Sequence, residues 1–389
     1  MNTLRHIKRL CGYIAGFVFF ISGILKLMDP TGAGLVMNEY YKFLHLGFLA
    51  FSSKMAGVLF AAAEAVIGAG LITGVWRRQI GTCAVVMQAF FTLLTLALFI
   101  FNPEMDCGCF GEAIHLTHGE TLAKNIILLG LLAAYIIPYK HLGTNRRRKY
   151  VSFGIVMLSV AIFSIYSWNN IPLVDFTSFK PGCKLQASEA SSGNVYESIF
   201  TYEKDGKQEE FTLSHLPDST WTFVKADTRL ISESSEAPVA LSFYEAASGE
   251  YRDEAAAQGK VMIISVYDTE LREKGWDKIR TFMSDSDEAG FRTLLLASSS
   301  DDIPEDLRNI LYISDYKTLI TMNRSNGGAS CFYDGELIGK WSLKHLPDMN
   351  ELLTIYNSDK TEIEIDQNSK GSLAFQGFLL YVFAVMLLL

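Results

Sequence analysis

Long apolar runs, separated by short polar or basic loops, dominate the first part of the chain. The runs lie at residues 11–28, 53–75, 79–101, 122–139, 151–168 and 373–389. About 20 apolar residues cross the hydrocarbon core of a bilayer, so the first five runs predict transmembrane helices. The last run is shorter and contains Gln376. We expect it to form a C-terminal membrane helix.

Between residues 173 and 371 the pattern is that of a water-soluble region. Short strand-like runs over 173–232 predict a small β-rich subdomain. From 238 to 358, predicted strands and helices alternate, which favours an α/β unit. Within it, residues 330–341 predict a β-hairpin around an Asp-Gly turn.

These patterns give a multi-domain membrane protein with an α-helical bundle and an extramembrane α/β domain. The expected parts are a four-helix bundle at 1–142, a fifth transmembrane helix at 150–170, the two soluble parts at 173–232 and 238–358, and a last membrane helix at 372–389.

Lys and Arg are concentrated in alternate loops, which sets the expected orientation. The basic clusters are Arg5, Lys8 and Arg9, then Arg77 and Arg78, and then Arg146 to Lys149. Basic loops stay in the cytoplasm. We therefore expect a cytoplasmic N-terminus in a bacterial inner membrane, with residues 29–52, the loop near 107–109 and the region 173–371 on the periplasmic side.

Composition restricts the partners. The chain is 49% hydrophobic, and its net charge is −8. A nucleic-acid partner needs a basic face, which argues against one here. A lipid bilayer is the expected partner. Small-solute transport is disfavoured because no inverted repeat is evident and only one acidic residue falls inside a membrane segment.

Two thiols, Cys107 and Cys109, flank Gly108 just beyond the third apolar run. Glycine relaxes the backbone there, so the two sulfurs can come within bonding range. A strained, exposed disulfide of this kind is labile and oxidising. Three interpretations stay open: a reversible redox pair, a static disulfide, or metal binding with His115 and His118 as further ligands.

The other outward-facing thiols receive different expectations. Cys331 lies in an apolar strand, which predicts a buried and inert thiol. Cys183 follows Pro181 and Gly182, which predicts an exposed loop and a thiol able to exchange with the Cys107–Cys109 pair.

Glu64 falls near the middle of the second apolar run, where a charge is costly and usually functional. Gln88 of the third run reaches a similar depth, which predicts a Glu64–Gln88 hydrogen bond. Lys26 lies nearer the outer surface, where its side chain is expected to snorkel. Glu64 then serves either as a structural hydrogen-bonding group or in quinone binding or proton relay. Quinone is the one cofactor that this position suggests.

Residues 1–140 resemble the DoxX/MauE family of four-helix membrane proteins, a family described as redox-associated. The residues that carry the resemblance are Phe20 to Pro30, Glu39 and Tyr40, Glu64 with Gly68 and Gly70, and Asp106 to Gly111. The resemblance implies a membrane bundle linked to redox chemistry.

Residues 238–357 resemble the thioredoxin-like fold, with two departures. The carriers are Gly327 to Gly335 with Lys340 and Trp341. After the first strand, where a thioredoxin carries Cys-x-x-Cys, this chain has Tyr267 to Leu271, and Gly327-Gly328 replaces the cis-proline. The outer domain is therefore expected to lack exchange activity of its own.

Two functions follow from these observations. The first is support of thiol–disulfide chemistry or redox maturation of envelope proteins, with Cys107 and Cys109 as the exchanging pair and an envelope protein as client. The alternative is a non-catalytic, membrane-anchored scaffold that binds an envelope partner through its thioredoxin-like domain.

Overall fold

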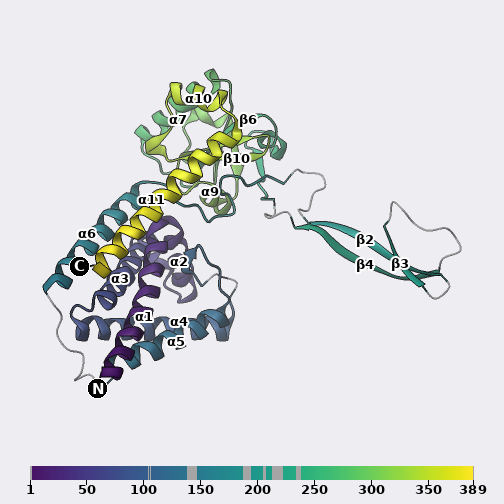
Figure 1. Ribbon diagram of the computed structural model, residues 1–389. Helices are drawn as coiled ribbons and strands as arrows, with labels where there is room; N and C mark the ends of the chain where they lie inside the picture. Colours follow the sequence, from purple (N-terminus) through teal and green to yellow (C-terminus); the bar gives the residue numbers. More distant parts are fainter. Residues whose placement is uncertain are drawn as a thin grey trace. The chain divides into compact units, whose positions relative to one another are not determined.

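The computed structural model describes residues 2–103, 105, 107–137, 147–186, 194–204, 207–212, 222–233 and 238–388. The chain divides into two compact units, one formed by Met1–Thr177 with Ile365–Leu389 and the other by Ser178–Glu364. Figure 1 shows the helices and strands of both units.

The first unit is helical. Its elements are α1 (Asn2–Met28), α2 (Pro30–Phe43), the 3₁₀ turn η1 (Gly47–Ser52), α3 (Ser53–Thr73), α4 (Arg77–Phe101), the short strand β1 (Cys109–Glu112), α5 (His118–Ile136), α6 (Arg147–Asn169) and most of α11 (Lys360–Leu388).

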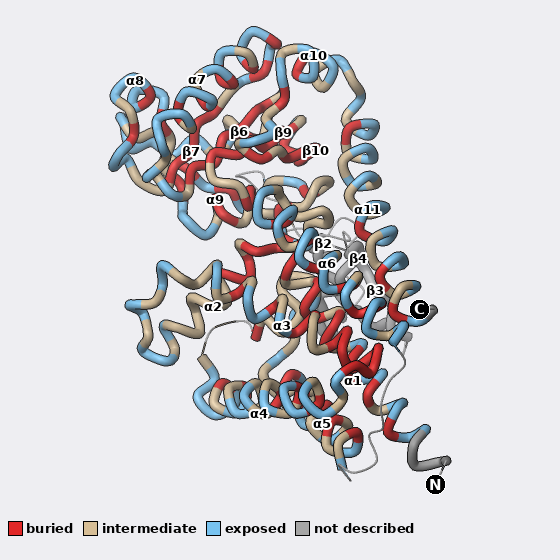
Figure 2. Tube along the Cα trace, turned by 90° about the vertical axis from the view of Figure 1, so that its left-hand side faces the viewer, coloured by how far each residue is buried: buried red, intermediate tan, exposed pale blue. Residues whose placement is uncertain are grey.

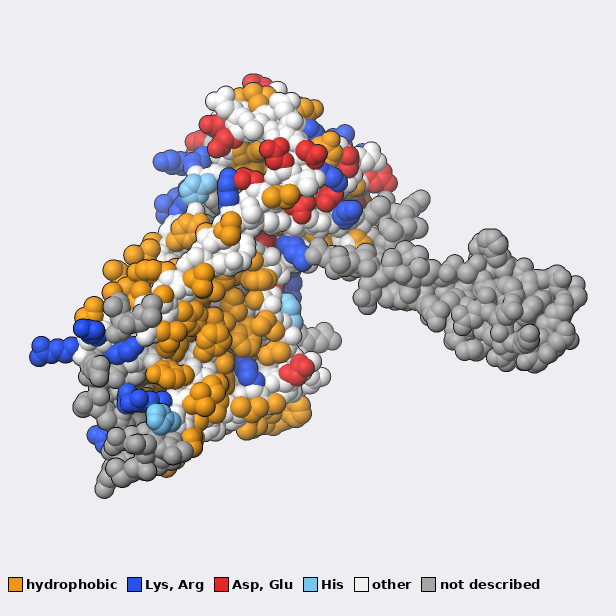
Figure 3. Space-filling view, in the orientation of Figure 1, with side chains coloured by type: hydrophobic (Ala, Val, Ile, Leu, Met, Phe, Trp, Pro, Cys, Tyr) orange, Lys and Arg blue, Asp and Glu red, His pale blue; other side chains and the backbone are white. Residues whose placement is uncertain are grey.

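Six helices of the described chain are long and apolar enough to cross a membrane: α1, η1 with α3, α4, α5, α6 and α11. Large apolar side chains on them point outward, such as Leu93 at 67% and Leu380 at 73% exposed. Figure 3 shows these hydrophobic side chains spread over the face of the bundle. Exposed apolar surface of this extent is expected where lipid is the solvent. The protein is a multi-pass membrane protein.

The predicted sixth run is part of a longer helix. The helix α11 begins at Lys360, well before the apolar run at 373. Its apolar end packs with α6, where Ser152 Oγ donates a hydrogen bond to the Val385 carbonyl at 2.6 Å and the Phe163 and Phe378 rings stack at 4.6 Å.

Small residues bring α1 and α3 into close contact. A Cβ added at Gly68 would lie 2.4 Å from the Phe20 nitrogen, and one at Gly23 would lie 2.5 Å from the Ala65 nitrogen. Neither position tolerates a side chain without movement of the backbones. Small residues at such positions let membrane helices approach closely. Figure 2 shows the buried stretch of α1 that results.

Residues 31–50 lie in α2 and η1 and in the short connection between them. Asp29 accepts a hydrogen bond from the Gly32 amide at 2.8 Å, and Pro30 occupies the first turn, which together start α2. The α2 residues Ala33 and Gly34 are buried against α3. The helix α2 is thereby held on the bundle, where it can position the loop near Cys107.

The second unit contains a mixed six-stranded sheet. Its strands are β5 (Phe243–Glu245), β6 (Lys260–Val266), β7 (Arg292–Ala297), β8 (Leu311–Ser314), β9 (Gly328–Tyr333) and β10 (Glu336–Trp341), in the order β10-β9-β6-β7-β8-β5. The pairs β6–β7 and β7–β8 are parallel, whereas β9, β10 and β5 run antiparallel to their neighbours.

Helices accompany this sheet: α7 (Glu273–Glu288), α8 (Glu305–Arg308), α9 (Tyr316–Met322) and α10 (Met349–Asn357), with the 3₁₀ turns η3 (Asp253–Ala256) and η4 (Leu343–His345). The predicted hairpin is confirmed, since β9 and β10 pair around Asp334 and Gly335. Both turn residues have positive φ, at 47° and 76°. The alternation predicted for 238–358 thus gives a mixed α/β sheet, while its thioredoxin-like identity stays a prediction.

A separate three-stranded antiparallel sheet, β3-β2-β4, also belongs to the second unit. It consists of β2 (Asn194–Lys204), β3 (Lys207–Thr212) and β4 (Thr222–Glu233). Residues 195–202, which are strand-like in sequence, lie within β2, and residues 210–212 lie within β3. The run at 220–223 only reaches the start of β4, and residues 220 and 221 lie outside the described residues.

Candidate functional site

A cavity of about 320 Å³ lies inside the helical unit. Residues of α1, α2, α3, α4 and α5 line it, together with the loop that carries the two thiols. The walls are mainly apolar, and most of the polar residues, apart from Tyr41 and Lys124, form three groups. They are the thiol loop (Cys107, Gly108, Cys109 and Tyr40), the charged group (Ser22, Lys26 and Glu64) and the amide group (Gln88, Thr95 and Asn125).

The thiol loop is held by hydrogen bonds from two helices. The Tyr40 hydroxyl of α2 donates to the Cys107 carbonyl. Ser22 Oγ of α1 lies 2.7 Å from the Cys109 carbonyl, which accepts its hydrogen bond. Burial, reinforced by the neighbouring Cys109, raises the pKa of Tyr40 well above its ordinary value, so this hydroxyl keeps its proton and remains a donor.

Gly108 is required by this packing. Its φ is +57°, and a Cβ there would lie 2.4 Å from Val36 Cγ1 of α2. A larger residue would have to adopt a left-handed backbone and push against α2 at the same time. The glycine between the two thiols therefore lets the loop lie directly on α2.

Cys107 contacts His118, the first residue of α5. Cys107 Sγ lies 2.9 Å from His118 Nδ1, and His118 Nε2 lies 3.1 Å from the Pro103 carbonyl. A carbonyl can only accept, so Nε2 carries the proton in the neutral ring and Nδ1 is free to accept the thiol proton. The arrangement is a thiol with an oriented base beside it, the geometry that activates a cysteine.

His118 is fixed by the start of its helix. Thr117 and Glu120 form a capping box at the N-terminus of α5, in which Glu120 accepts from the Thr117 amide at 2.9 Å. The ring of His118 then lies between the Cys107 sulfur and the Pro103 carbonyl. Cys107 is 3% exposed, whereas Cys109 is half-buried. The two thiols are thus unequal in access and in partner.

The four-donor metal interpretation finds no support in this geometry. His115 Nε2 lies 4.0 Å from Glu112 Oε2, and its side chain is largely exposed. No cluster of three or more His, Cys, Asp or Glu residues suited to a metal ion occurs in the described part of the chain. His118, considered only as a metal ligand from the sequence, instead places a basic ring nitrogen 2.9 Å from Cys107 Sγ. All six cysteines are described, and the structure joins none of them in a disulfide.

Glu64 is buried, as its position predicts, but its partners differ from the expected one. Its Oε2 accepts from Lys26 Nζ at 2.7 Å and from Ser22 Oγ at 3.1 Å. The predicted Glu64–Gln88 hydrogen bond is wrong: Gln88 Nε2 donates instead to the Asn125 carbonyl at 3.2 Å. Glu64 and Gln88 both line the cavity. Their side chains nevertheless have different hydrogen-bond partners, because α3 and α4 turn them in different directions.

Lys26 does not snorkel outward. Its ammonium group pairs with Glu64 and lies 5.6 Å from the centre of the Phe91 ring, and its side chain is only 17% exposed. Inside an apolar bundle the two opposite charges stabilise each other, which removes the cost of burying either alone.

The two remaining predictions for thiols have opposite outcomes. Cys331 is fully buried in β9, as expected, and burial raises its pKa to about 12. The exposed loop predicted for Cys183 is wrong, since Cys183 is only 3% exposed. The cause is pairing with β10: the Gly182 amide donates to the Leu337 carbonyl at 2.7 Å, and the Leu337 amide donates to the Cys183 carbonyl at 2.9 Å.

Comparison with known proteins gives partial matches. Residues 4–138 match the family model "Methylamine utilisation protein MauE", and residues 196–233 match a domain of unknown function, DUF8463. Protein TlpB of Flavobacterium psychrophilum is 24% identical over 150 residues, which cover 38% of this chain and 41% of TlpB. The matched part thus spans about two fifths of that relative. No solved structure matches. The matches support a MauE-like membrane protein over the region that contains the cavity and the thiol loop.

Proposed function

We propose that this protein carries out thiol–disulfide exchange at the bacterial inner membrane, with Cys107 and Cys109 as the exchanging pair and a periplasmic face toward its clients. The function is redox maturation of envelope proteins. The observation that carries the proposal is the contact of Cys107 with the oriented His118 ring in a loop fixed on the bundle.

The two thiols have different roles. Cys109, the more accessible sulfur, forms the mixed disulfide with a client. His118 accepts the Cys107 proton, and the resulting thiolate attacks Cys109 Sγ. A Cys107–Cys109 bond forms, the bond between Cys109 and the client breaks, and the client sulfur leaves as a thiolate. The reverse sequence transfers the disulfide to a client, and His118 then returns the proton to Cys107.

The periplasmic orientation rests on the basic clusters at the opposite ends of the helices. Arg77 and Arg78 begin α4, directly after the short connection from α3, and Arg147 to Lys149 begin α6. Basic loops remain cytoplasmic, which leaves the α4–α5 loop with its thiols on the oxidising side.

Trapping of the mixed disulfide tests the proposal. Full-length protein in nanodiscs is reduced, exposed to oxidised glutathione, quenched with acid and alkylated before peptide mass spectrometry. The Cys107→Ser variant should accumulate glutathione on Cys109, because the resolving thiolate is missing. The Cys109→Ser variant should accumulate far less on the buried Cys107.

Cys331→Ser is the matched control, since it removes a buried thiol of the other unit. It should resemble the unsubstituted protein. If neither Cys107→Ser nor Cys109→Ser captures glutathione and the unsubstituted protein forms no Cys107–Cys109 disulfide, the exchange proposal is wrong and the scaffold interpretation takes its place.

A further inference from the structure

Two aromatic residues of the cavity wall are also exposed on the outside of the bundle. Phe60 of α3 and Phe90 of α4 both line the cavity and are 42% and 47% exposed on the outside of the bundle. Their rings stack with centres 6.4 Å apart. Both helices are among the membrane spans. This part of the cavity wall therefore separates the cavity from the hydrocarbon phase by two aromatic rings only, which favours a lipid-soluble ligand.

Two buried side-chain amides of the cavity wall can form hydrogen bonds with a ligand. Gln88 and Asn125 are each 2% exposed and line the cavity. The side-chain nitrogen of Gln88 donates to the backbone carbonyl of Asn125, and the side-chain nitrogen of Asn125 donates to Thr95 Oγ1. Each amide also carries a side-chain oxygen that can accept a hydrogen bond from a ligand. Groups of this kind, buried in an apolar wall, orient a ligand that carries a few polar atoms.

The thiols and the charged pair lie on the same cavity as these amides. Cys107 and Cys109 line it, as do Lys26 and Glu64. The volume of about 320 Å³ is at the small end of ligand sites. It suits a planar headgroup, with any long apolar tail left in the lipid.

We propose that the cavity binds the headgroup of an isoprenoid quinone, which reoxidises the thiol pair. This inference rests on the proposed exchange function and adds its electron acceptor. Two electrons and two protons leave Cys107 and Cys109. Their two S–H bonds break, one S–S bond forms, and both quinone carbonyls become hydroxyls. Lys26, a cation on the cavity wall, would stabilise the negative charge that develops on the quinone oxygens.

The direct test uses decylubiquinone, whose ring carbons are all substituted, so that thiols do not simply add to the ring. Reduced protein in quinone-free nanodiscs is mixed with it under anaerobic conditions. One quinol should appear for each Cys107–Cys109 disulfide formed, and a Cys107→Ser/Cys109→Ser variant should give none.

Failure of this inference is separable from failure of the exchange function. If the pair exchanges with glutathione at the normal rate but decylubiquinone stays oxidised, the quinone site is wrong and the exchange function stands. If the pair reacts with neither, the exchange function itself is wrong.

Binding is measured independently of the thiols by a photoactivatable azidoquinone on the double serine variant. Label should map to peptides of α3 and α4 and be displaced by decylubiquinone. Label that spreads over all lipid-facing helices without displacement would mean unspecific partitioning into lipid and would overturn the site.

Variants on α4 sharpen the measurement. Gln88→Leu should weaken quinone competition about 2- to 10-fold, the effect of one lost neutral hydrogen bond. Thr82→Val is the matched control: Thr82 is exposed on the same helix and bonds only to its own Arg78 carbonyl. Equal competition in both variants would exclude Gln88 from the site.

Discussion

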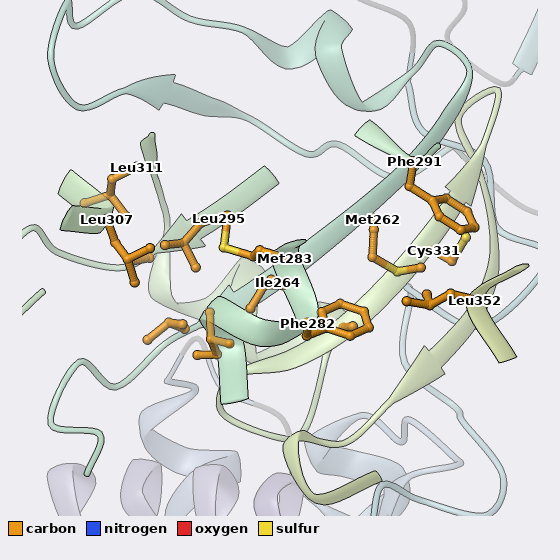
Figure 4. Packing of buried hydrophobic residues seen from close by; sticks show 14 of the residues in the cluster. Met262, Ile264, Phe282, Met283, Phe291, Leu295, Leu307, Leu311, Cys331 and Leu352 are labelled. Atoms are coloured by element: carbon orange, nitrogen blue, oxygen red, sulfur yellow. The ribbon is translucent and has the colours of Figure 1, made fainter. Parts of the chain in front are cut away.

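Cys107 in the helical unit and Cys331 in the α/β unit are both buried, yet their surroundings differ. Cys107 has an imidazole nitrogen at 2.9 Å and opens onto a cavity. Cys331 lies among Met262, Phe291 and Leu352 in a closed apolar core (Figure 4). Burial alone therefore does not decide whether a thiol reacts. A nearby base and space for a second reactant decide it.

The largest expected difference between the thiols is in their reactivity toward alkylating reagents, and Cys331 is the least reactive. Its pKa is raised from an ordinary value of 9.0 to about 12, so its neutral thiol persists while an ordinary thiol ionises. Three pKa units correspond to roughly 1,000-fold less thiolate at pH 8. Alkylation by iodoacetamide, followed by mass spectrometry from pH 7 to 10, should leave Cys331 unmodified while Cys109 reacts.

The same shift has a consequence for folding. Because the unfolded thiol ionises at lower pH than the folded one, Cys331 stabilises the fold below pH 9 and this contribution is lost as the pH rises toward 12. Rapid labelling of Cys331 in the folded protein at pH 8 would contradict the closed core.

Substitution of His118 removes the base that lies beside Cys107. His118→Asn should slow resolution of the mixed disulfide about 100-fold at pH 7, the lower end of what a positioned base contributes. The rate is measured by quenching the exchange with glutathione at a series of times. His115→Asn is the control, since His115 lies in the same loop with a largely exposed side chain, and its Nε2 lies 4.0 Å from Glu112 Oε2. Equal rates for both variants would remove His118 from the mechanism.

Much of the architecture follows from the sequence, whereas the site follows only in part. Apolar runs report membrane helices because lipid imposes one solvent along the whole span, and the Asp334-Gly335 turn is local. The direction in which a helix turns a given side chain, by contrast, depends on how the whole helix packs against its neighbours. The partner of Glu64 depended on which way α1 turns Lys26.

Misjudged residues show the same limit. Cys183 follows loop-forming residues, but its burial depends on β10, far away in the sequence. The spacing of Cys107 and His118 was a usable signal, although spacing does not distinguish a metal ligand from a base. No local pattern indicates a cavity, since its walls come from five helices.

Two glycines of the thiol loop provide a comparison at smaller scale. Gly108 and Gly111 both have positive φ, but a Cβ would lie 2.4 Å from Val36 at Gly108 and 3.7 Å from its nearest neighbour at Gly111. Gly108→Ala should cost about 2–4 kcal/mol, because strain and overpacking combine, and Gly111→Ala about 1–2 kcal/mol. Denaturation in mixed micelles measures both. Similar costs would mean that the loop does not pack on α2.

The smallest effects come from two capping boxes, one in each unit. Thr117→Ala at α5 and Asp348→Ala at α10 should each lower stability by about 1 kcal/mol. Only Thr117→Ala should also slow thiol exchange, since it loosens the turn that holds His118. Exchange rates and thermal unfolding, measured on the same samples, separate the two effects. Slower exchange in Asp348→Ala would show that the rate follows general stability.

The central claim is tested most directly by equilibrating full-length protein in nanodiscs with graded ratios of reduced to oxidised glutathione and counting the Cys107–Cys109 disulfide by mass spectrometry. The account predicts a single reversible transition confined to this pair, with Cys331 and Cys183 reduced throughout. A chain in which Cys107 and Cys109 stay thiols at every ratio, or pair irreversibly, would contradict it.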